Sequence, residues 1–329
     1  MASKSNEILH ELSPLMQVYK DGRVERLVGK DVVAASVDQE TGVESKDVQI
    51  SQELDISARL YLPKKAKQGT KLPLLVYFHG GGFSVESAFS PFYHTYLNAV
   101  VAEADVVAVS VNYRLAPEHP LPTAYEDSWI ALQWVASHSN WEGPETWLRG
   151  YADFDRVFLG GDSAGGNIAH NMALKVGLEK LKGVNVEGIF LNCPYFWGKE
   201  PVGSEATRLE KKGHLEASSF LCRSYVEATW HFVYPNTTGL DDPLLNPVME
   251  PNLSRLGCRR VLVCVAEQDI LRDRGWFYKE ALEKSEWAGD VEVVEVAGED
   301  HVFNLFFPKG ENALSLLKKL ASFINGNGV

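Results

Sequence analysis

Short runs of apolar residues alternate with helix-length amphipathic stretches from about residue 72 to the C-terminus. The apolar runs predict strands at 72–78, 106–111, 156–159, 186–191, 260–266 and 291–296. Apolar positions with a helical period predict helices at 92–104, 124–138, 168–176, 274–284 and 313–324. Runs without polar alternation are typical of strands covered on both faces. We therefore predict an α/β fold with a mostly parallel central sheet flanked by helices.

Two regions depart from this rhythm. The first 50 residues are mixed and polar, and Asp21-Gly22 predicts a hairpin turn. Residues 48–62 alternate well enough for one or two strands. Residues 197–251 separate two predicted strands and are rich in aromatic residues, proline and glycine. So long an interruption is typical of a lid over a site, and a surface helical insertion with its own small core is the alternative.

Composition and charge narrow the class of protein. The 329 residues include 45% hydrophobic and 23% charged residues, which excludes a disordered tail, a collagen-like fibre and a coiled coil. The length suits two domains or one α/β domain with insertions. The 32 basic and 44 acidic residues give a net charge of −12. Because nucleic acids and anionic membranes are polyanions, we expect neither as a partner.

The ends of the chain and its cysteines predict a cytoplasmic location. The first residues show no apolar stretch typical of a signal peptide, and no segment approaches 18 apolar residues. The four cysteines have no CxxC spacing, so we expect reduced thiols.

A candidate nucleophile follows the predicted strand at 156–159. Residues 161–165 read Gly-Asp-Ser-Ala-Gly and precede a predicted helix, which matches the G-x-S-x-G nucleophile elbow around Ser163. A serine on a sharp strand-to-helix turn needs small neighbours, because the backbone is strained and a substrate must approach closely. Alone, this motif is weak evidence for a nucleophile. Its position between a predicted strand and a predicted helix makes that evidence stronger.

A glycine-rich loop follows the predicted strand at 72–78. His79 is followed by Gly80, Gly81 and Gly82, whose backbone N–H groups can approach a reacting carbonyl, as in the oxyanion loop of esterases and lipases. The alternatives are a plain glycine turn or a phosphate cradle. No phosphate-loop pattern or dinucleotide fingerprint is present, and the histidines lack metal-ligand spacing. We therefore predict no cofactor and no metal.

Two further groups complete a catalytic triad in the order Ser163, Asp269, His301, which is the order expected of an α/β-hydrolase. Asp269 and His301 follow the predicted strands at 260–266 and 291–296. A serine hydroxyl needs a base, and the imidazole needs a carboxylate to orient it. Taken alone, His301 suits a structural role, and Asp269 suits a helix N-cap or a salt bridge to Arg272 or Arg274. Other acids compete for the carboxylate role: Asp273, Glu267 and Glu299.

Four motifs together resemble the hormone-sensitive-lipase-like branch of α/β-hydrolases. They are His-Gly-Gly-Gly at 79–82, Asn-Tyr-Arg-Leu-Ala-Pro at 112–117, Gly-Asp-Ser-Ala-Gly-Gly-Asn at 161–167 and Asp-Ile-Leu-Arg-Asp at 269–273. Tyr-Lys-Asp-Gly-Arg-Val-Glu-Arg at 19–26 resembles the plant carboxylesterase subgroup. That subgroup also contains 2-hydroxyisoflavanone dehydratases, alkaloid-forming cyclases and the gibberellin receptors.

The resemblance implies one α/β-hydrolase domain over residues 1–329, with 1–45 and 197–251 as cap segments. It also implies an oxyanion hole from the N–H groups of Gly80, Gly81, Gly82 and Ala164. The receptors have lost the catalytic histidine, whereas His301 is present here, and some dehydratases carry threonine where Ser163 stands.

We therefore predict a cofactor-independent serine carboxylesterase that acts on small to medium esters through an acyl-enzyme. Its partner is a small-molecule ester or a related plant metabolite. A dehydratase or cyclase of plant specialised metabolism on the same scaffold is the alternative, and a ligand-binding receptor is a weaker one. The sequence predicts neither the natural substrate nor the oligomeric state.

Overall fold

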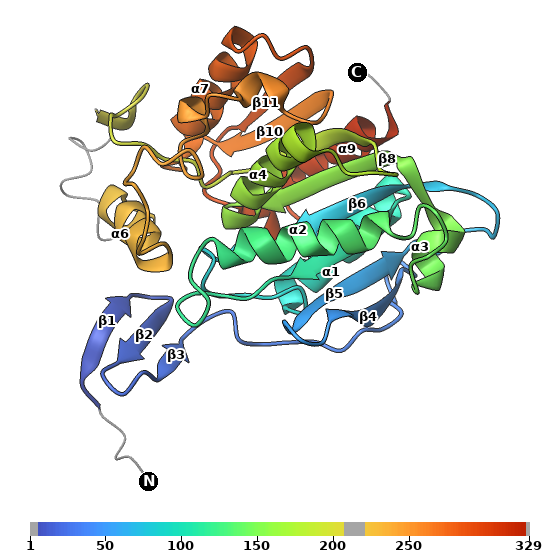
Figure 1. The fold of residues 1–329 in the computed structure, drawn as a ribbon, viewed down its shortest axis with the longest axis horizontal. Helices are drawn as coiled ribbons and strands as arrows, with labels where there is room; N and C mark the ends of the chain where they lie inside the picture. Colours follow the sequence, from blue (N-terminus) through green and yellow to red (C-terminus); the bar gives the residue numbers. More distant parts are fainter. Residues whose placement is uncertain (1–5, 207–220, 327–329) are drawn as a thin grey trace.

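A twisted eight-stranded sheet forms the centre of the molecule (Figure 1). This computed structural model describes residues 6–206 and 221–326. The strand order is β11-β10-β9-β8-β6-β7-β5-β4. The strands are β4 (Glu44–Ser51), β5 (Ile56–Leu62), β6 (Leu72–Phe78), β7 (Val107–Asn112), β8 (Ala152–Asp162), β9 (Val186–Asn192), β10 (Arg260–Ala266) and β11 (Asp290–Val296). Strands β6 to β11 pair in parallel, and only β5 and β4 at one edge pair antiparallel, which confirms the predicted sheet.

Helices cover both faces of this sheet (Figure 1). The helices of the described residues are α1 (Pro91–Ala104), α2 (Thr123–Ala136), α3 (Thr146–Tyr151), α4 (Ala164–Glu179), α6 (Arg223–Val233), α7 (Arg272–Lys284), α8 (Phe303–Phe306) and α9 (Glu311–Asn325), of which α6 lies away from this sheet. Two 3₁₀ turns, η2 (Pro247–Met249) and η3 (Leu253–Arg255), precede β10. Successive strand residues such as Val76 and Tyr77 point to opposite faces. One face packs on α2, α4 and α7, and the other packs on α1 and α9.

The predicted elements are confirmed, with differences at their ends. Strands β6 and β10 have the predicted bounds, because their apolar residues are buried without interruption. Strand β8 is longer than the predicted run at 156–159. Asp153 and Asp155 before that run, and the glycines after it, break the apolar pattern although they belong to the strand. Helix α4 begins four residues earlier than predicted, at Ala164, because its glycine-rich first turn hides the helical period.

The N-terminal segment forms a separate three-stranded sheet of β1 (Ile8–Leu12), β2 (Met16–Tyr19) and β3 (Val24–Arg26). Strands β2 and β3 pair antiparallel around Asp21-Gly22, which confirms the predicted hairpin turn. This sheet lies beside α6 (Figure 1), and the rings of His10 and Phe232 pack edge to face. Met16 is fully buried there. Two segments far apart in the sequence therefore pack against each other.

The interruption at 197–251 contains α6 and η2, and its residues 207–220 lie outside the described residues. A buried ion pair fastens its first part to α7: Arg274 donates hydrogen bonds of 2.6 and 2.8 Å to the Glu205 carboxylate. Arg274 also donates to the carbonyl oxygens of Gly198 and Glu200 and lies over the Trp197 ring. One guanidinium group thus organises the start of this segment.

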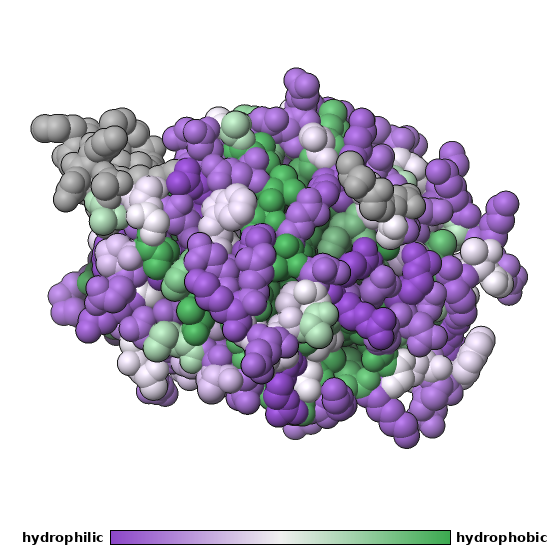
Figure 2. All heavy atoms as spheres, turned by 90° about the horizontal axis from the view of Figure 1, so that it is seen from above, coloured by the Kyte–Doolittle hydropathy of each residue, from purple (hydrophilic) through white to green (hydrophobic). Residues whose placement is uncertain are grey.

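Hydrophilic side chains dominate the face in Figure 2, and hydrophobic side chains gather near the middle of that face. No helix within residues 6–206 and 221–326 is long and apolar enough to span a membrane. All four cysteines are free, as predicted.

Candidate active site

Ser163 stands on the sharp turn between β8 and α4. Its backbone has φ 51° and ψ −119°, a conformation that side chains rarely adopt. The turn closes because glycines flank it: a Cβ on Gly161 would lie 2.2 Å from the carbonyl oxygen of Gly165. A Cβ on Gly165 would lie 1.9 Å from that of Phe78. The sequence thus forms a strained elbow that holds the Ser163 hydroxyl at the N-terminus of α4.

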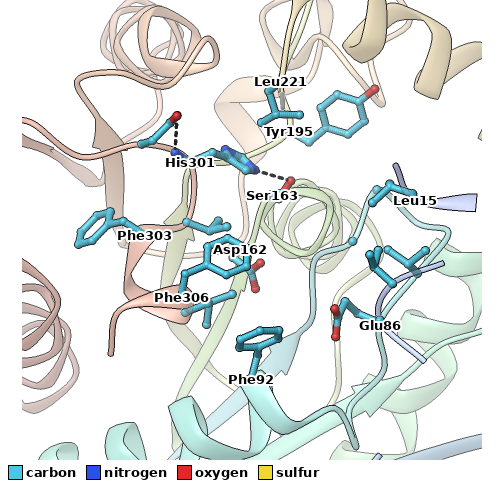
Figure 3. A pocket seen from close by; sticks show the side chains of 18 of the residues that line it. Leu15, Glu86, Phe92, Asp162, Ser163, Tyr195, Leu221, His301, Phe303 and Phe306 are labelled. Carbon is cyan, nitrogen blue, oxygen red and sulfur yellow. Dashed lines mark hydrogen bonds between the residues drawn. The ribbon is translucent and has the colours of Figure 1, made fainter. Parts of the chain in front are cut away.

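Three side chains that follow three different strands meet at this turn. His301 Nε2 lies 3.0 Å from Ser163 Oγ (Figure 3), and His301 Nδ1 lies 2.7 Å from Asp269 Oδ2. The other Asp269 oxygen accepts the N–H of Leu271 at 2.9 Å, which fixes the carboxylate. The structure therefore brings the three predicted residues into one hydrogen-bonded chain. Such a chain can move a proton from the serine hydroxyl to the imidazole.

The competing acids have other partners. Asp273 accepts hydrogen bonds from Ser204 and Arg272. Glu267 accepts the N–H of Gly298, and Glu299 accepts from Asn312. The arginines suggested as salt-bridge partners of Asp269 pair instead with Asp273 and Glu205. Asp269 is thus the acid that orients His301.

The charge balance around His301 favours its protonated form. Burial lowers the pKa of His301, but the Asp269 carboxylate, its hydrogen bond and the charges of Asp162 and Asp300 together raise it by more, so the net pKa is above the usual value. A buried cysteine that sequence analysis did not assign, Cys193, lies beside this pair. Burial and the Asp269 charge raise the pKa of the Cys193 thiol well above its usual range, so it stays protonated.

The glycine loop after β6 lies next to the elbow, because β6 and β8 are neighbours in the sheet. Gly81 and Gly82 line the cavity in front of Ser163, and both have positive φ angles, 92° and 58°. No acceptor within the described residues takes their N–H groups. The N–H of Gly80 instead donates to Tyr93 Oη at 2.7 Å. The Gly80 N–H is therefore engaged in this structure, so the geometry favours Gly81 and Gly82 over Gly80 for the predicted oxyanion hole.

A buried tyrosine network, missed by sequence analysis, ties the loop to the elbow. Tyr93 donates to Asp162 Oδ2 at 2.9 Å, and Tyr77 donates to Asp162 Oδ1 at 2.8 Å. Burial raises the pKa of Asp162 to about 6, although both tyrosine hydroxyls stabilise the carboxylate. Tyr93 therefore contacts both Gly80 and Asp162 and fixes the glycine loop against the serine turn.

His79 and the predicted structural turn at 112–118 support the same loop. His79 donates from Nδ1 to the carbonyl oxygen of Gly80, and its ring stacks on Tyr113 at 4.2 Å. Burial lowers the pKa of His79 to about 4, so it is neutral at neutral pH. Arg114 is held by a bidentate contact to the buried Asp127. These contacts are structural, as predicted for the turn.

A cavity of about 770 Å³ opens in front of Ser163. This volume suits a drug-sized molecule. Its walls come from the N-terminal segment, the region of α6 and the C-terminal part of the chain. They include Pro14, Leu15, Val28, Tyr225, Val226, Phe303 and Phe306. The rings of Phe92 and Phe306 lie 5.5 Å apart, and Figure 3 shows both beside the cavity. The cavity is therefore mainly apolar and aromatic.

Comparison with known proteins agrees with this geometry. Residues 75–305 match the alpha/beta hydrolase fold family. The 2-hydroxyisoflavanone dehydratase of Glycyrrhiza echinata is 49% identical over 97% of both chains. Probable carboxylesterase 13 of Arabidopsis thaliana is also 49% identical, over 98% of this chain and 99% of its own.

Solved structures share the architecture. A hyperthermophilic esterase from the archaeon Pyrobaculum calidifontis superposes with a TM-score of 0.72 at 28% identity, over 86% of both chains. A thermostable carboxylesterase from a metagenomic library gives a TM-score of 0.72 at 30% identity, over 89% of this chain and 90% of its own. The chain thus belongs to the α/β-hydrolase family, in the plant branch of carboxylesterases and 2-hydroxyisoflavanone dehydratases.

Proposed function

We propose that the protein is a serine carboxylesterase that hydrolyses small to medium carboxylic esters. The hydrogen-bonded chain of Ser163, His301 and Asp269 at the floor of an apolar cavity is the observation that supports it most strongly. The esterases among its relatives and structural neighbours support the same reaction class.

The reaction begins when His301 accepts the Ser163 proton as Oγ attacks the ester carbonyl carbon. The N–H groups of Gly81, Gly82 and Ala164 stabilise the negative oxygen of the tetrahedral intermediate. His301 then gives its proton to the leaving alcohol, and an acyl-enzyme remains on Ser163. Water, deprotonated by His301, attacks the acyl carbon and releases the acid, and the serine hydroxyl is restored.

We further propose that residues 1–45 and 197–251 act as cap segments that set substrate choice. Pro14, Leu15, Val28 and residues of α6 line the cavity, which supports this role for both segments. The acyl and alcohol preferences then depend on side chains outside the central sheet.

Hydrolysis of p-nitrophenyl acetate and butyrate tests the esterase proposal. We expect turnover by the wild type and a fall in kcat of about 10⁶ in Ser163→Ala, the scale seen when a triad serine is lost. Ser254→Ala, which removes an exposed hydroxyl away from the cavity, should retain wild-type turnover. Near-wild-type turnover by a folded Ser163→Ala protein would contradict the acyl-enzyme mechanism.

A dehydratase or cyclase activity is the second candidate, because a relative of 49% identity carries the name of a dehydratase. In that case His301 transfers a proton without an acyl-enzyme, and Ser163 only donates a hydrogen bond. His301→Gln should then reduce activity more than Ser163→Ala. Ester turnover that depends on Ser163, with no elimination of water from hydroxylated flavanones, would exclude this candidate for the site.

A further inference from the structure

The cavity has a polar group that the triad chemistry does not use. Glu86 lies on the loop between β6 and α1, and it lines the same cavity as Ser163. Figure 3 shows its carboxyl group turned toward the cavity, on the wall near Leu15 and Phe92. The rest of that wall is mainly apolar, so this acid is a chemical exception that calls for a reason.

One oxygen of Glu86 lacks the hydrogen bond that a shielded carboxyl oxygen normally has, although the carboxyl group also bonds Ser90. Its Oε2 is shielded from solvent and has no partner among the described residues. The other acids that line the cavity differ. Asp162 accepts from two tyrosines, Glu299 accepts from Asn312, and Asp300 accepts the N–H of His301. A buried unpaired carboxyl oxygen is costly, and such groups are normally satisfied by a partner or a ligand.

The fold holds Glu86 in this place at some cost. Its backbone has a φ of 70°, a left-handed conformation that is unusual for glutamate. Gly29 packs directly against it: a Cβ at that position would lie 2.7 Å from the Glu86 nitrogen and 2.9 Å from Oε1. The terminal torsion of a glutamate is soft, so either oxygen can turn toward the cavity while the backbone stays fixed.

The mainly apolar lining of the cavity favours a neutral donor over a cation as the partner of Glu86. Burial raises the pKa of Glu86, the nearby Asp31 charge raises it further, and Ser90 partly offsets this effect. A hydroxyl group costs far less to bring into an apolar cavity than an ammonium group does. We propose that Glu86 accepts a hydrogen bond from a hydroxyl group on an otherwise apolar, aromatic ester and so determines which esters are hydrolysed. This role rests on the proposed esterase function.

Matched substrates test this role. The acyl side is probed with 4-nitrophenyl esters of 3-phenylpropanoic acid and of its 3- and 4-hydroxyphenyl, methoxyphenyl and aminomethylphenyl analogues. The alcohol side is probed with butyrate esters of 2-phenylethanol and of its hydroxyphenyl analogues. We expect the wild type to prefer at least one hydroxylated ester about tenfold in kcat/KM over its unsubstituted and methoxy counterparts, the scale of a hydrogen bond to a charged group.

Variants assign the preference to Glu86. Glu86→Leu should bring the ratio of kcat/KM values near one, because the acceptor of the hydroxyl group is gone. Glu86→Gln, which retains an acceptor oxygen, should keep part of the preference. Glu126→Gln removes the same charge from an exposed position on α2 and should keep the wild-type ratio. A preference for the aminomethyl ester would mean that Glu86 binds a cation rather than a hydroxyl group, and it would overturn the proposal.

Binding separates this proposal from the esterase reaction. The Ser163→Ala protein, titrated by calorimetry with 3-phenylpropanol and its hydroxyphenyl analogues, should bind a hydroxylated compound about tenfold more tightly, and adding Glu86→Leu should abolish the difference. This readout does not need turnover, so it holds or fails even if no ester is hydrolysed. Equal affinities in both proteins, or a preference that survives Glu86→Leu, would overturn the role of Glu86.

Discussion

In the proposed mechanism His301 acts as a base only in its neutral form, so its surroundings should set the pH dependence of ester turnover. Because Asp269 raises the pKa of this histidine above the usual value, we expect kcat/KM to fall as the pH drops through a pKa above 6.5. In Asp269→Asn, burial still lowers the pKa of His301, and the largest of the opposing charges is gone while those of Asp162 and Asp300 remain. The fall in kcat/KM at acidic pH should then move to lower pH, and kcat should decrease by about 10⁴-fold. A pH–rate series on p-nitrophenyl butyrate measures both effects.

Asp273→Asn is the matched control for this series. Asp273 is a neighbouring acid that bonds Ser204 and Arg272 rather than His301. The control should keep the wild-type fall in kcat/KM at acidic pH. An equal shift in both variants would show that general charge, not contact with His301, sets the pKa of His301.

Sequence order predicted the triad residues because each directly follows a strand. Glu86 and Tyr93 were not predicted, because their importance depends on how loops converge in space.

Among the elements, α7 carries a contact that should dominate the stability of the segment beginning at Trp197. Arg274 and Glu205 form a buried pair, and the loss of one partner leaves a buried charge uncompensated. We expect Arg274→Met to lower the free energy of unfolding by about 3–5 kcal/mol in urea titrations. Lys279→Met breaks an exposed pair with Glu283 on the same helix and should cost less than about 0.5 kcal/mol. Equal losses in both variants would contradict this ranking.

The helices and strands also show which elements sequence patterns can predict. Strands such as β6 and β10 were predicted with their full bounds, because strands buried on both faces leave an unbroken apolar run. Strand β1 and helix α3 were not predicted. Most of β1 is exposed and shows no apolar alternation. Helix α3 has only six residues and depends on a local cap, in which Glu145 accepts the N–H of Trp147. Short elements set by local contacts or by packing have no periodic signal.

On the scale of the whole molecule, the β1–β3 sheet pairs with no other strand of the described residues, yet it supplies part of the cavity wall. Removal of residues 1–30 should therefore leave the central sheet folded, with an unchanged far-ultraviolet circular dichroism spectrum apart from the lost hairpin. It should raise KM for the bulky phenylpropanoate esters about tenfold, because a bound aromatic group would lose apolar contacts. KM for p-nitrophenyl acetate should change much less. An equal rise for both esters would mean that the segment supports the triad itself.

This arrangement also gives the two parts of the site different freedom to vary. The serine turn is confined by backbone contacts at Gly161 and Gly165, where no larger residue fits. The β1–β3 sheet reaches the cavity with Leu15, which lies in the turn between β1 and β2 and outside the serine turn. If the proposed cap role holds, substitutions in the β1–β3 sheet should change substrate preference while the triad stays intact. Exchange of this sheet between relatives would then be a practical route to new specificities.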